Sequence, residues 1–410
     1  MNPVFANALT LIMAGGRGER LYPLTRDMAK PAVDFAGSYK IIDFTLSNCF
    51  NSGIRQVYLL TQYSNLTMNR HLKLGWDMLF RGELDEFIEA LPPQHRMSED
   101  WYHGTADSIY QNIELLERHK PEYVLILSGD HVYKMDYSKM LDYHVARGAE
   151  MTIAAVEVER SMAREMGVLG IDADNRVLEF VEKPQEPPTM PSDPKKSLVS
   201  MGVYVFTTAK LVRELIRDAK DTNSAHDFGR SIIPALVGRG EKVVVYPFRD
   251  EHHNRPAYWR DIGTLESYYA ANLDLADPYP EINLYDPDWP IRTYFGQHPP
   301  ARITDSSIEL GLQGKVVDSL ISSGCVISGG SVEKSVLSPE VRVHTGARVT
   351  ESILLHGVDV GRKAVVHKAL VCPGVRIPDG MTIGVDSESD RARFIVTPKG
   401  VTVVPGGFVW

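Results

Sequence analysis

Three glycines and three cationic residues lie close together near the start of the chain. Residues 15–21 read GGRGERL and directly follow an apolar run at residues 9–14. Glycine allows the backbone to approach a polyphosphate closely, with amide N–H groups turned toward it. Arginine and lysine add charge-assisted hydrogen bonds to phosphate oxygens, although a glycine turn could also simply connect a strand to a helix. The candidate phosphate-binding residues are Gly15, Gly16, Arg17, Gly18, Arg20 and Lys30.

The spacing within this turn excludes two common phosphate loops. A P-loop requires lysine directly after its last glycine, and Glu19 occupies that position. The dinucleotide-binding fingerprint requires a third glycine where this chain has Leu21. The glycine turn is therefore neither a P-loop nor a dinucleotide-binding turn.

Two aspartates are candidates for holding a metal ion. Asp130 comes just after an apolar run at residues 123–127, and Asp261 lies in the motif YWRDIGT at residues 258–264. Ligands of open α/β sheets bind beyond the carboxyl ends of the strands, and Mg²⁺ prefers carboxylate oxygens. Asp130 could instead cap a turn or helix, and Asp261 could be a loop residue before the expected N-cap Thr264. The stronger hypothesis is that both carboxylates bind one ion.

Other polar positions have both a functional and a simpler interpretation. Glu182 and Lys183 end a strand candidate and, taken alone, would form a solvated surface pair. Gly202 could be an ordinary strand glycine. Asp107 could simply favour the first turn of its helix.

The composition is that of an ordinary soluble globular protein. The chain has 410 residues, of which 43% are apolar and 24% charged, so two domains are expected. A net charge of −9 argues against nucleic acid or an anionic membrane as a partner. Three widely spaced cysteines indicate neither a disulfide framework nor a zinc site, and a cytoplasmic location is expected. No signal peptide is indicated, and no apolar run approaches the ~20 residues of a membrane span.

Strand and helix patterns alternate up to about residue 275. This alternation predicts an α/β domain with a largely parallel sheet. A helix is expected at residues 105–120, and a hairpin is expected where residues 168–171 and 177–181 flank an Asp-Ala-Asp-Asn turn. The main strand candidates are residues 9–14, 56–61, 123–127 and 151–158.

The last part of the chain has a different pattern. Six prolines between residues 278 and 300 mark a linker, and helical patterns end there. Aliphatic residues then recur at steps of six, which is typical of a β-helix, with an irregular β-sandwich as the alternative. The phase slips by one residue at 355→360 and at 366→371. The recurring residues are Leu337, Val343, Val349, Leu355, Val360, Val366, Val371, Ile377 and Ile383.

In their order and spacing, these motifs closely resemble those of the glucose-1-phosphate adenylyltransferases, which are sugar-nucleotide pyrophosphorylases. The resemblance runs nearly end to end and rests on many motifs together, because no single one decides it. It implies a Rossmann-like, mostly parallel nucleotidyltransferase domain at residues 1–277, a proline-rich linker at 278–300 and a left-handed parallel β-helix at 301–410. The other matching motifs are Lys30-Pro31-Ala32-Val33, Ser47-Asn48, residues 51–54, Trp101-Tyr102, residues 104–107, SGDHVYKMDY at 128–137, FVEKP at 180–184 and Ser200-Met201-Gly202.

The resemblance also implies a reaction and a role for each matching residue. ATP and α-D-glucose 1-phosphate would form ADP-glucose and pyrophosphate with Mg²⁺, for glycogen synthesis in a cytoplasmic homotetramer. Arg17 and the glycine turn would bind the triphosphate, and Lys30 would lie beside the reacting phosphates. Asp130 and Asp261 would hold the metal, with Asp130 the central catalytic residue. The residues that match the family's glucose 1-phosphate positions are Tyr102, Gly167, Glu182, Lys183 and Ser200.

The chain departs from the family pattern at a few positions. Asp27 and Met28 replace a basic pair found in relatives that fructose 1,6-bisphosphate activates, and the C-terminus lacks their basic tail. Activation by that bisphosphate is therefore not expected. Ala257 replaces a usual proline, and Met166 replaces a usual phenylalanine beside Gly167.

Three alternative functions remain open at this stage. The enzyme could use UTP or dTTP in place of ATP. It could be a catalytically silent regulatory subunit, although the retained site residues argue against this. These are Arg17, Lys30, Asp130, Lys183 and Asp261. The repeat region could be an acyltransferase. The candidate bases for that activity would be His344, His356 and His367, each of which is more simply a surface residue at a repeat corner.

Overall fold

The computed structural model describes residues 7–62, 65–93, 102–190, 193–250, 253, 255–305 and 313–410. The described chain forms two compact units. One unit contains the described residues within 1–16, 45–129 and 134–259, and the other contains those within 17–44, 130–133 and 260–410. No helix of the described residues is long and apolar enough to cross a membrane.

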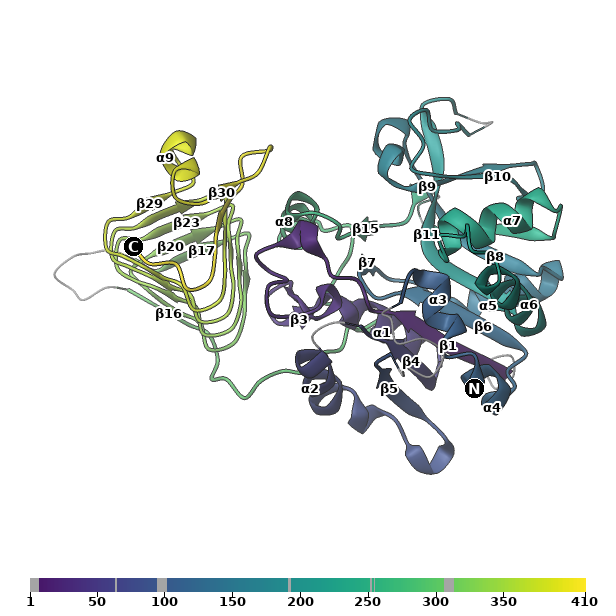
Figure 1. The fold of residues 1–410 in the computed structure, drawn as a ribbon. Helices are drawn as coiled ribbons and strands as arrows, with labels where there is room; N and C mark the ends of the chain where they lie inside the picture. The colour runs from purple at the N-terminus through teal and green to yellow at the C-terminus, as the bar shows by residue number, and fades with distance from the viewer. Residues whose placement is uncertain are drawn as a thin grey trace. The chain divides into compact units, whose positions relative to one another are not determined.

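The first unit is built on a nine-stranded sheet (Figure 1). Strands β5, β4, β1 and β6 lie parallel to one another, as the alternation of strands and helices predicts. The long strand β11 runs antiparallel to β6, β8 and β9, so the complete sheet is mixed. Its strands are β1 (Ala8–Met13), β4 (Gln56–Leu60), β5 (Phe87–Leu91), β6 (Tyr123–Ser128), β8 (Met151–Glu159), β9 (Gly167–Ile171), β10 (Val177–Glu182), β11 (Lys196–Thr207) and β12 (Val243–Pro247).

Helices cover this sheet and bury its apolar side chains. Leu9 and Leu11 of β1 share one core cluster with Ile109, Leu211 and Leu236, which come from three helices. Alternate residues of a strand point to the same face, so these helices cover one face of the sheet. The helices that contribute to this cluster are α3 (Thr105–Tyr110), α4 (Glu114–His119), α6 (Thr208–Ala219) and α7 (Ile233–Gly238). The remaining helices of the unit include α2 (Asn65–Gly75) and α5 (Tyr137–Arg147), and α1 (Ile41–Asn51) spans the boundary between the units.

The single helix expected at residues 105–120 is wrong in one respect, because a turn divides it into α3 and α4. Around the turn, the amides of Asn112 and Ile113 donate to carbonyls three residues earlier instead of four. The Asn112 side chain also donates to the Ser108 carbonyl at 2.8 Å. Asparagine competes for backbone hydrogen bonds in this way, which favours a turn over a continuous helix.

The hairpin predicted around Asp-Ala-Asp-Asn is confirmed, since β9 and β10 pair antiparallel. Its register places Gly167, at the start of β9, opposite Glu182, at the end of β10. Two candidate residues that are well separated in sequence are thereby aligned as cross-strand neighbours.

The C-terminal strands form the coils of a β-helix, as predicted (Figure 1). All the pairs between successive coils that the structure describes are parallel. The first sheet contains β16 (Arg302–Thr304), β19 (Val326–Ser328), β22 (Arg342–Val343), β25 (Asp359–Val360) and β28 (Arg376–Ile377). The second contains β17 (Lys315–Val317), β20 (Ser331–Glu333), β23 (Arg348–Thr350), β26 (Val365–His367) and β29 (Thr382–Ile383). The third contains β18 (Leu320–Ile321), β21 (Val336–Leu337), β24 (Ile353–Leu354), β27 (Ala369–Val371), β31 (Thr402–Val404) and β30 (Ile395–Val396).

The coil length explains the slip at 366→371 and corrects the other one. Leu354 is aligned with Leu337 and Val371, so the recurring residue predicted at Leu355 is wrong by one position and the short side runs from 349 to 354. Val332, Val349, Val366 and Ile383 are aligned on one face, each 17 residues after the one before. Three sides of six residues would need 18, so one side of each such coil is a residue shorter. These aligned side chains are fully buried and form a column in the core of the β-helix.

Candidate functional site

Asp130 and Asp261, both of the second unit, are brought together by a two-stranded sheet. The strand β7 (His131–Tyr133) pairs with β15 (Trp259–Asp261). The Ile262 amide also donates to the Asp130 carbonyl at 3.4 Å. The two aspartates therefore lie close together, which the sequence alone could not show.

Lys30 lies between the two carboxylates. Its Nζ is 2.5 Å from Oδ2 of Asp130 and 3.5 Å from Oδ1 of Asp261. Its side chain is only 10% exposed. Burial lowers the pKa of Lys30, but the two adjacent carboxylates outweigh that effect and raise the pKa. The ammonium group therefore stays charged and neutralises part of the acidic cluster.

His131 completes this cluster, and sequence reasoning missed it although it lies inside a matching motif. Its Nε2 is 3.4 Å from Oδ1 of Asp130 and 3.8 Å from Oδ1 of Asp261. One ligand atom from each of the three residues lies within 4.8 Å of the others. Two carboxylate oxygens and one imidazole nitrogen at this spacing fit a divalent cation.

The glycine turn supports Lys30 directly. Gly18 has φ +65°, and a Cβ atom there would lie 2.8 Å from Cβ of Lys30. The Thr25 hydroxyl donates to the Gly18 carbonyl at 2.9 Å, which fixes the turn against the segment that leads to Lys30. In contrast, Gly16 has open space where a side chain would be. Gly15 approaches Gln62, with a Cβ position 3.1 Å from Cβ of that residue.

The two arginines of the turn differ in position. Arg17 is largely exposed and lies 3.6 Å from Glu19, at the start of the short 3₁₀ helix η2 (Glu19–Leu21). Arg20 lies beside Gly263, where a guanidinium nitrogen is 3.4 Å from a Cβ position on that glycine. Arg20 is therefore next to the segment that carries Asp261.

The predicted sugar-phosphate residues Gly167, Glu182 and Lys183 lie together in the first unit. A Cβ on Gly167 would lie 2.6 Å from Cζ of Phe180 and 3.0 Å from Oε2 of Glu182, so a side chain at this position would press on both residues. Burial and the nearby Asp227 carboxylate raise the pKa of Glu182, against the opposing charges of Lys183 and Arg230. Lys183 has φ +49°, and its amide donates to the Met166 carbonyl at 3.0 Å.

Asp227 is a second residue that sequence reasoning missed. Its carboxylate accepts hydrogen bonds from the amides of Gly229 and Arg230, at the start of the π-helix η7 (Phe228–Ile232). It also accepts one from the Thr105 hydroxyl at 2.8 Å. Asp227 therefore fixes the backbone beside Glu182, since a Cβ on Gly229 would lie 2.9 Å from Oε2 of Glu182.

Ser200 is the last residue of the first β11 segment that pairs with β8, just before a shift of register. Its hydroxyl accepts from the Gly202 amide at 3.2 Å and lies 3.5 Å from the Tyr204 hydroxyl. Gly202 has φ +65°, which identifies it as part of this bulge instead of an ordinary strand glycine. The carboxylates of Asp227 and Glu182 are close enough to Tyr204 to contribute to the raised pKa of its buried hydroxyl, although burial is the main cause.

Tyr102 is partly buried, and its hydroxyl accepts from the Asn112 side chain at 3.1 Å. Burial raises the pKa of this hydroxyl. Trp101, which precedes it in the matching motif, lies outside the described residues. Asp107 has the simpler role considered for it, because its carboxylate accepts from the His103 amide at 2.9 Å before α3.

Thr264 is confirmed as an N-cap. Its side chain and that of Ser267 form a reciprocal capping box at the start of α8 (Leu265–Asp274). This cap fixes the backbone immediately after Asp261.

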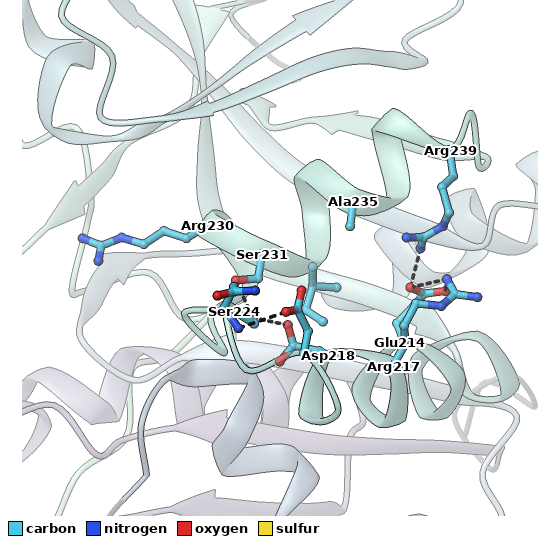
Figure 2. A pocket seen from close by; sticks show the side chains of 11 residues that line it. Glu214, Arg217, Asp218, Ser224, Arg230, Ser231, Ala235 and Arg239 are labelled. Atoms are coloured by element: carbon cyan, nitrogen blue, oxygen red, sulfur yellow. Dashed lines mark hydrogen bonds and ion pairs between the residues drawn. The ribbon is translucent and has the colours of Figure 1, made fainter.

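A separate polar pocket of about 320 Å³ lies between α6 and the segment formed by η7 and α7 (Figure 2). None of the predicted site residues lines it. Arg217 and Arg239 both contact the buried Glu214 carboxylate, and Asp218 contacts the Ser224 hydroxyl, as Figure 2 shows. Because these charges compensate one another, the pocket supports the fold instead of indicating a catalytic centre.

The histidines considered for an acyltransferase are all paired on the β-helix. His344 lies 2.7 Å from Asp359, His356 lies 3.5 Å from Glu340, and His367 lies 2.9 Å from the Thr350 hydroxyl. These contacts join side chains on neighbouring coils or turns, which fits the simpler interpretation as surface residues.

Comparisons with known proteins match both parts of the chain. Residues 9–278 match the nucleotidyl transferase family, and residues 299–404 match a GlmU-like C-terminal hexapeptide family. The glucose-1-phosphate adenylyltransferase of Koribacter versatilis (strain Ellin345) is 50% identical over 97% of this chain and 94% of its own length. The enzyme of the same name from Dechloromonas aromatica (strain RCB) is 48% identical over 97% of this chain and 90% of its own length. The enzyme of the same name from Rhodopirellula baltica (strain DSM 10527 / NCIMB 13988 / SH1) is 47% identical over 99% of this chain and 91% of its own length.

The chain belongs to the glucose-1-phosphate adenylyltransferase family. The resemblance seen in the sequence is thereby confirmed, and so is the succession of a nucleotidyltransferase domain and a hexapeptide domain. As a member of this family, the protein is a nucleotidyltransferase. Nucleotidyltransferases generally use divalent metal ions, and the cluster of Asp130, His131 and Asp261 offers suitable ligands for one.

Proposed function

We propose that this protein transfers the adenylyl group of ATP to α-D-glucose 1-phosphate, which forms ADP-glucose and releases pyrophosphate. The observation that carries this proposal is the position of Lys30 between the carboxylates of Asp130 and Asp261. A fixed cation beside two potential metal ligands is the arrangement that a reaction between phosphate groups requires. The names of the relatives support the choice of ATP and glucose 1-phosphate as substrates.

The reaction does not need a nucleophilic side chain. The phosphate of glucose 1-phosphate is already an anion at neutral pH and can attack the α-phosphorus of ATP itself. The protein must hold the attacking oxygen, the phosphorus and the leaving pyrophosphate in line and reduce the repulsion among them. We assign the binding of the triphosphate to Gly15, Gly16, Arg17 and Gly18.

We assign Lys30 to the stabilisation of negative charge on the reacting phosphates. Its raised pKa keeps it protonated, so it donates hydrogen bonds to phosphate oxygens without changing its own charge. Asp130 holds the Lys30 ammonium group through its Oδ2 atom. Asp130 and Asp261 would also hold Mg²⁺, which screens the phosphates and stabilises charge on the leaving pyrophosphate when bound.

The sugar phosphate is assigned to the residues of the first unit. Glu182 would accept hydrogen bonds from sugar hydroxyls, and Lys183 would contact the phosphate. The close approach of Gly167 to Glu182 supports this, because a side chain at that position would press on the carboxylate. Tyr102 and Ser200 complete the proposed set of glucose 1-phosphate ligands.

The cellular setting is proposed from family membership. The product would serve glycogen synthesis in the cytoplasm, with the active protein a homotetramer. Neither a nucleic acid nor a membrane is a proposed partner, since the net charge is −9.

Pyrophosphate release measured with ATP, UTP and dTTP, each with glucose 1-phosphate, tests this proposal. We expect turnover with ATP to exceed that with the other two triphosphates by at least about 10-fold in kcat/KM, which is about 1.4 kcal/mol of transition-state discrimination. Preferred use of UTP or dTTP would replace ATP in the proposal. An absence of turnover with every triphosphate would support the silent-subunit alternative instead.

A further inference from the structure

We propose that His131 is a direct ligand of the divalent cation, through Nε2, and that it makes the site bind Mn²⁺ more tightly than Mg²⁺. This inference rests on the proposed metal role of Asp130 and Asp261. It adds a nitrogen to a ligand set of carboxylate oxygens and thereby predicts which cation the site prefers.

The spacing of the donor atoms supports direct ligation. Metal–ligand bonds of about 2.1 Å at right angles separate two donor atoms by roughly 3 Å. Nε2 of His131 lies 3.4 Å from Oδ1 of Asp130 and 3.8 Å from Oδ1 of Asp261. These two separations would shorten by about 0.4 Å and about 0.8 Å if both atom pairs shared one octahedral ion. All three donor atoms already lie within 4.8 Å of one another.

Lys30 and His131 lie next to different carboxylate oxygens of Asp130. The ammonium group contacts Oδ2, whereas the imidazole faces Oδ1. A cation bound on the Oδ1 side could therefore be held without breaking the contact between Lys30 and Asp130. Lys30 Nζ also lies 3.5 Å from Oδ1 of Asp261, the oxygen that the imidazole faces, so the ammonium group would move away from this oxygen when the ion binds. Lysine and metal ion would then act together in the same acidic cluster.

The backbone places His131 firmly in this position. It is the first residue of β7, and its side chain is buried. Asp130 directly precedes it, and Asp261 ends the partner strand β15. Both carboxylates and the imidazole therefore lie in or next to the two-stranded sheet of β7 and β15. Little side-chain freedom is then lost when they bind one ion.

The chemistry of the donors determines the cation. Mg²⁺ favours oxygen ligands and tolerates departures from octahedral geometry poorly. Imidazole nitrogen is a better ligand for transition metals than for Mg²⁺. Adding one imidazole to two carboxylates should therefore raise the affinity for Mn²⁺ relative to that for Mg²⁺. Replacing His131 by glutamine, which offers an amide in place of imidazole, should reduce this preference.

The experiment uses Mn²⁺ as a spectroscopic probe on the full-length protein. Electron paramagnetic resonance gives the Kd of Mn²⁺, electron spin-echo envelope modulation detects a directly bonded imidazole nitrogen, and competition gives the Kd of Mg²⁺. For the parent protein we expect nitrogen modulation. For His131→Gln we expect the modulation to disappear and Mn²⁺ binding to weaken at least about 10-fold, with a smaller loss for Mg²⁺.

His344→Gln is the matched control, because it removes another imidazole that lies beside an aspartate, Asp359. This variant should retain both the modulation and the parent Kd. Mn²⁺ that binds the parent without nitrogen modulation, or equal losses for Mn²⁺ and Mg²⁺ in His131→Gln, would overturn the role of His131. Asp130→Asn separates this result from failure of the proposed function, since Mn²⁺ binding that is unchanged in Asp130→Asn would refute the metal site itself.

Discussion

Lys30 Nζ lies 2.5 Å from Asp130 Oδ2, although 100 positions separate the two residues in the sequence. The lysine belongs to the 3₁₀ segment η3 (Lys30–Ala32), close to the glycine turn, and the aspartate follows the central strand β6. The fold thus places a protonated amine against a carboxylate that is also a candidate metal ligand. This pair is the point at which charge on the reacting phosphates would be controlled.

Asp130→Asn should leave a folded protein that is nearly inactive. The amide can still accept a hydrogen bond from Lys30, but it removes a negative charge needed to hold a divalent cation. We expect kcat/KM to fall by at least about 10²–10³-fold, which is the usual effect of losing one transition-state electrostatic contact. Pyrophosphate release and thermal unfolding should be measured together, with Asp174→Asn in an exposed turn as the control. Substantial turnover by Asp130→Asn would refute the assigned role.

Lys30→Met should make the stability of the protein depend on a divalent cation. Removing the ammonium leaves two carboxylates close together, each about a quarter to a third exposed. We expect a loss of roughly 1–3 kcal/mol in the free energy of unfolding, below the value for a fully buried pair. Mg²⁺ should recover part of this loss, because it can supply the missing positive charge. Thermal unfolding with EDTA or Mg²⁺ is the measurement, and an equal Mg²⁺ effect on Lys30→Met and the parent would contradict the idea.

The site residues that lie in local sequence motifs could be predicted, whereas their long-range contacts could not. The glycine turn and the two aspartates have local motifs, so the sequence indicated their chemistry. Their convergence depends on the pairing of β7 with β15, two strands of three residues, which carry too little pattern to be paired from sequence. Asp227 was missed because it caps a short π-helix, whose five residues have no periodic signal.

The fold was easier to predict where the pattern repeats. The hexapeptide spacing indicated the β-helix correctly, and the slip at 366→371 corresponds to the shorter side of a 17-residue coil. The continuous helix at 105–120 was wrong because periodic apolar residues persist across a turn that Asn112 favours. Periodicity reports which residues face the core, and it does not detect a break that preserves this face.

Gly18→Ala and Gly16→Ala should separate two roles of the glycine turn. At Gly18, φ is +65° and a new Cβ would lie 2.8 Å from Cβ of Lys30, so alanine should destabilise the turn by about 1–2 kcal/mol and displace Lys30. At Gly16 nothing lies within 4 Å of a new Cβ, so stability should be unchanged. If a triphosphate approaches this backbone, Gly16→Ala should still raise the KM for ATP. Thermal unfolding and KM for ATP distinguish the effects, and an unchanged KM in Gly16→Ala would remove Gly16 from the proposed nucleotide site.

Glu182→Gln should change both stability and sugar binding, with a defined pH dependence. The pKa of Glu182 is raised above its ordinary value of 4.5, mainly by burial and then by Asp227. A raised carboxyl pKa means that the folded protein disfavours the ionised form, so this residue lowers stability progressively as the pH rises from about 4.5 through its folded pKa. Glutamine should therefore make the protein as stable as the parent or more stable at neutral pH, with a difference that shrinks as the pH falls toward 4.5.

The same variant should bind the sugar phosphate poorly, because the amide replaces a carboxylate proposed to accept hydrogen bonds from sugar hydroxyls. We expect the KM for glucose 1-phosphate to rise by about 10-fold or more and the KM for ATP to change little. Glu179→Gln, an exposed position on the same strand, is the control. A KM for glucose 1-phosphate that stays at the parent value would exclude Glu182 from sugar binding.

Fructose 1,6-bisphosphate should activate this enzyme weakly or not at all. Asp27 is largely exposed where activated relatives carry a basic residue, and its carboxylate accepts a hydrogen bond from Arg26 Nε at 2.8 Å. An acidic side chain there repels a bisphosphate and also competes with it for the Arg26 guanidinium. A panel of phosphorylated sugars and pyruvate in the pyrophosphate-release assay would show whether another metabolite regulates the enzyme. Asp27→Lys should increase the response to fructose 1,6-bisphosphate, Asp174→Lys should not, and strong activation of the parent protein would show that this inference is wrong.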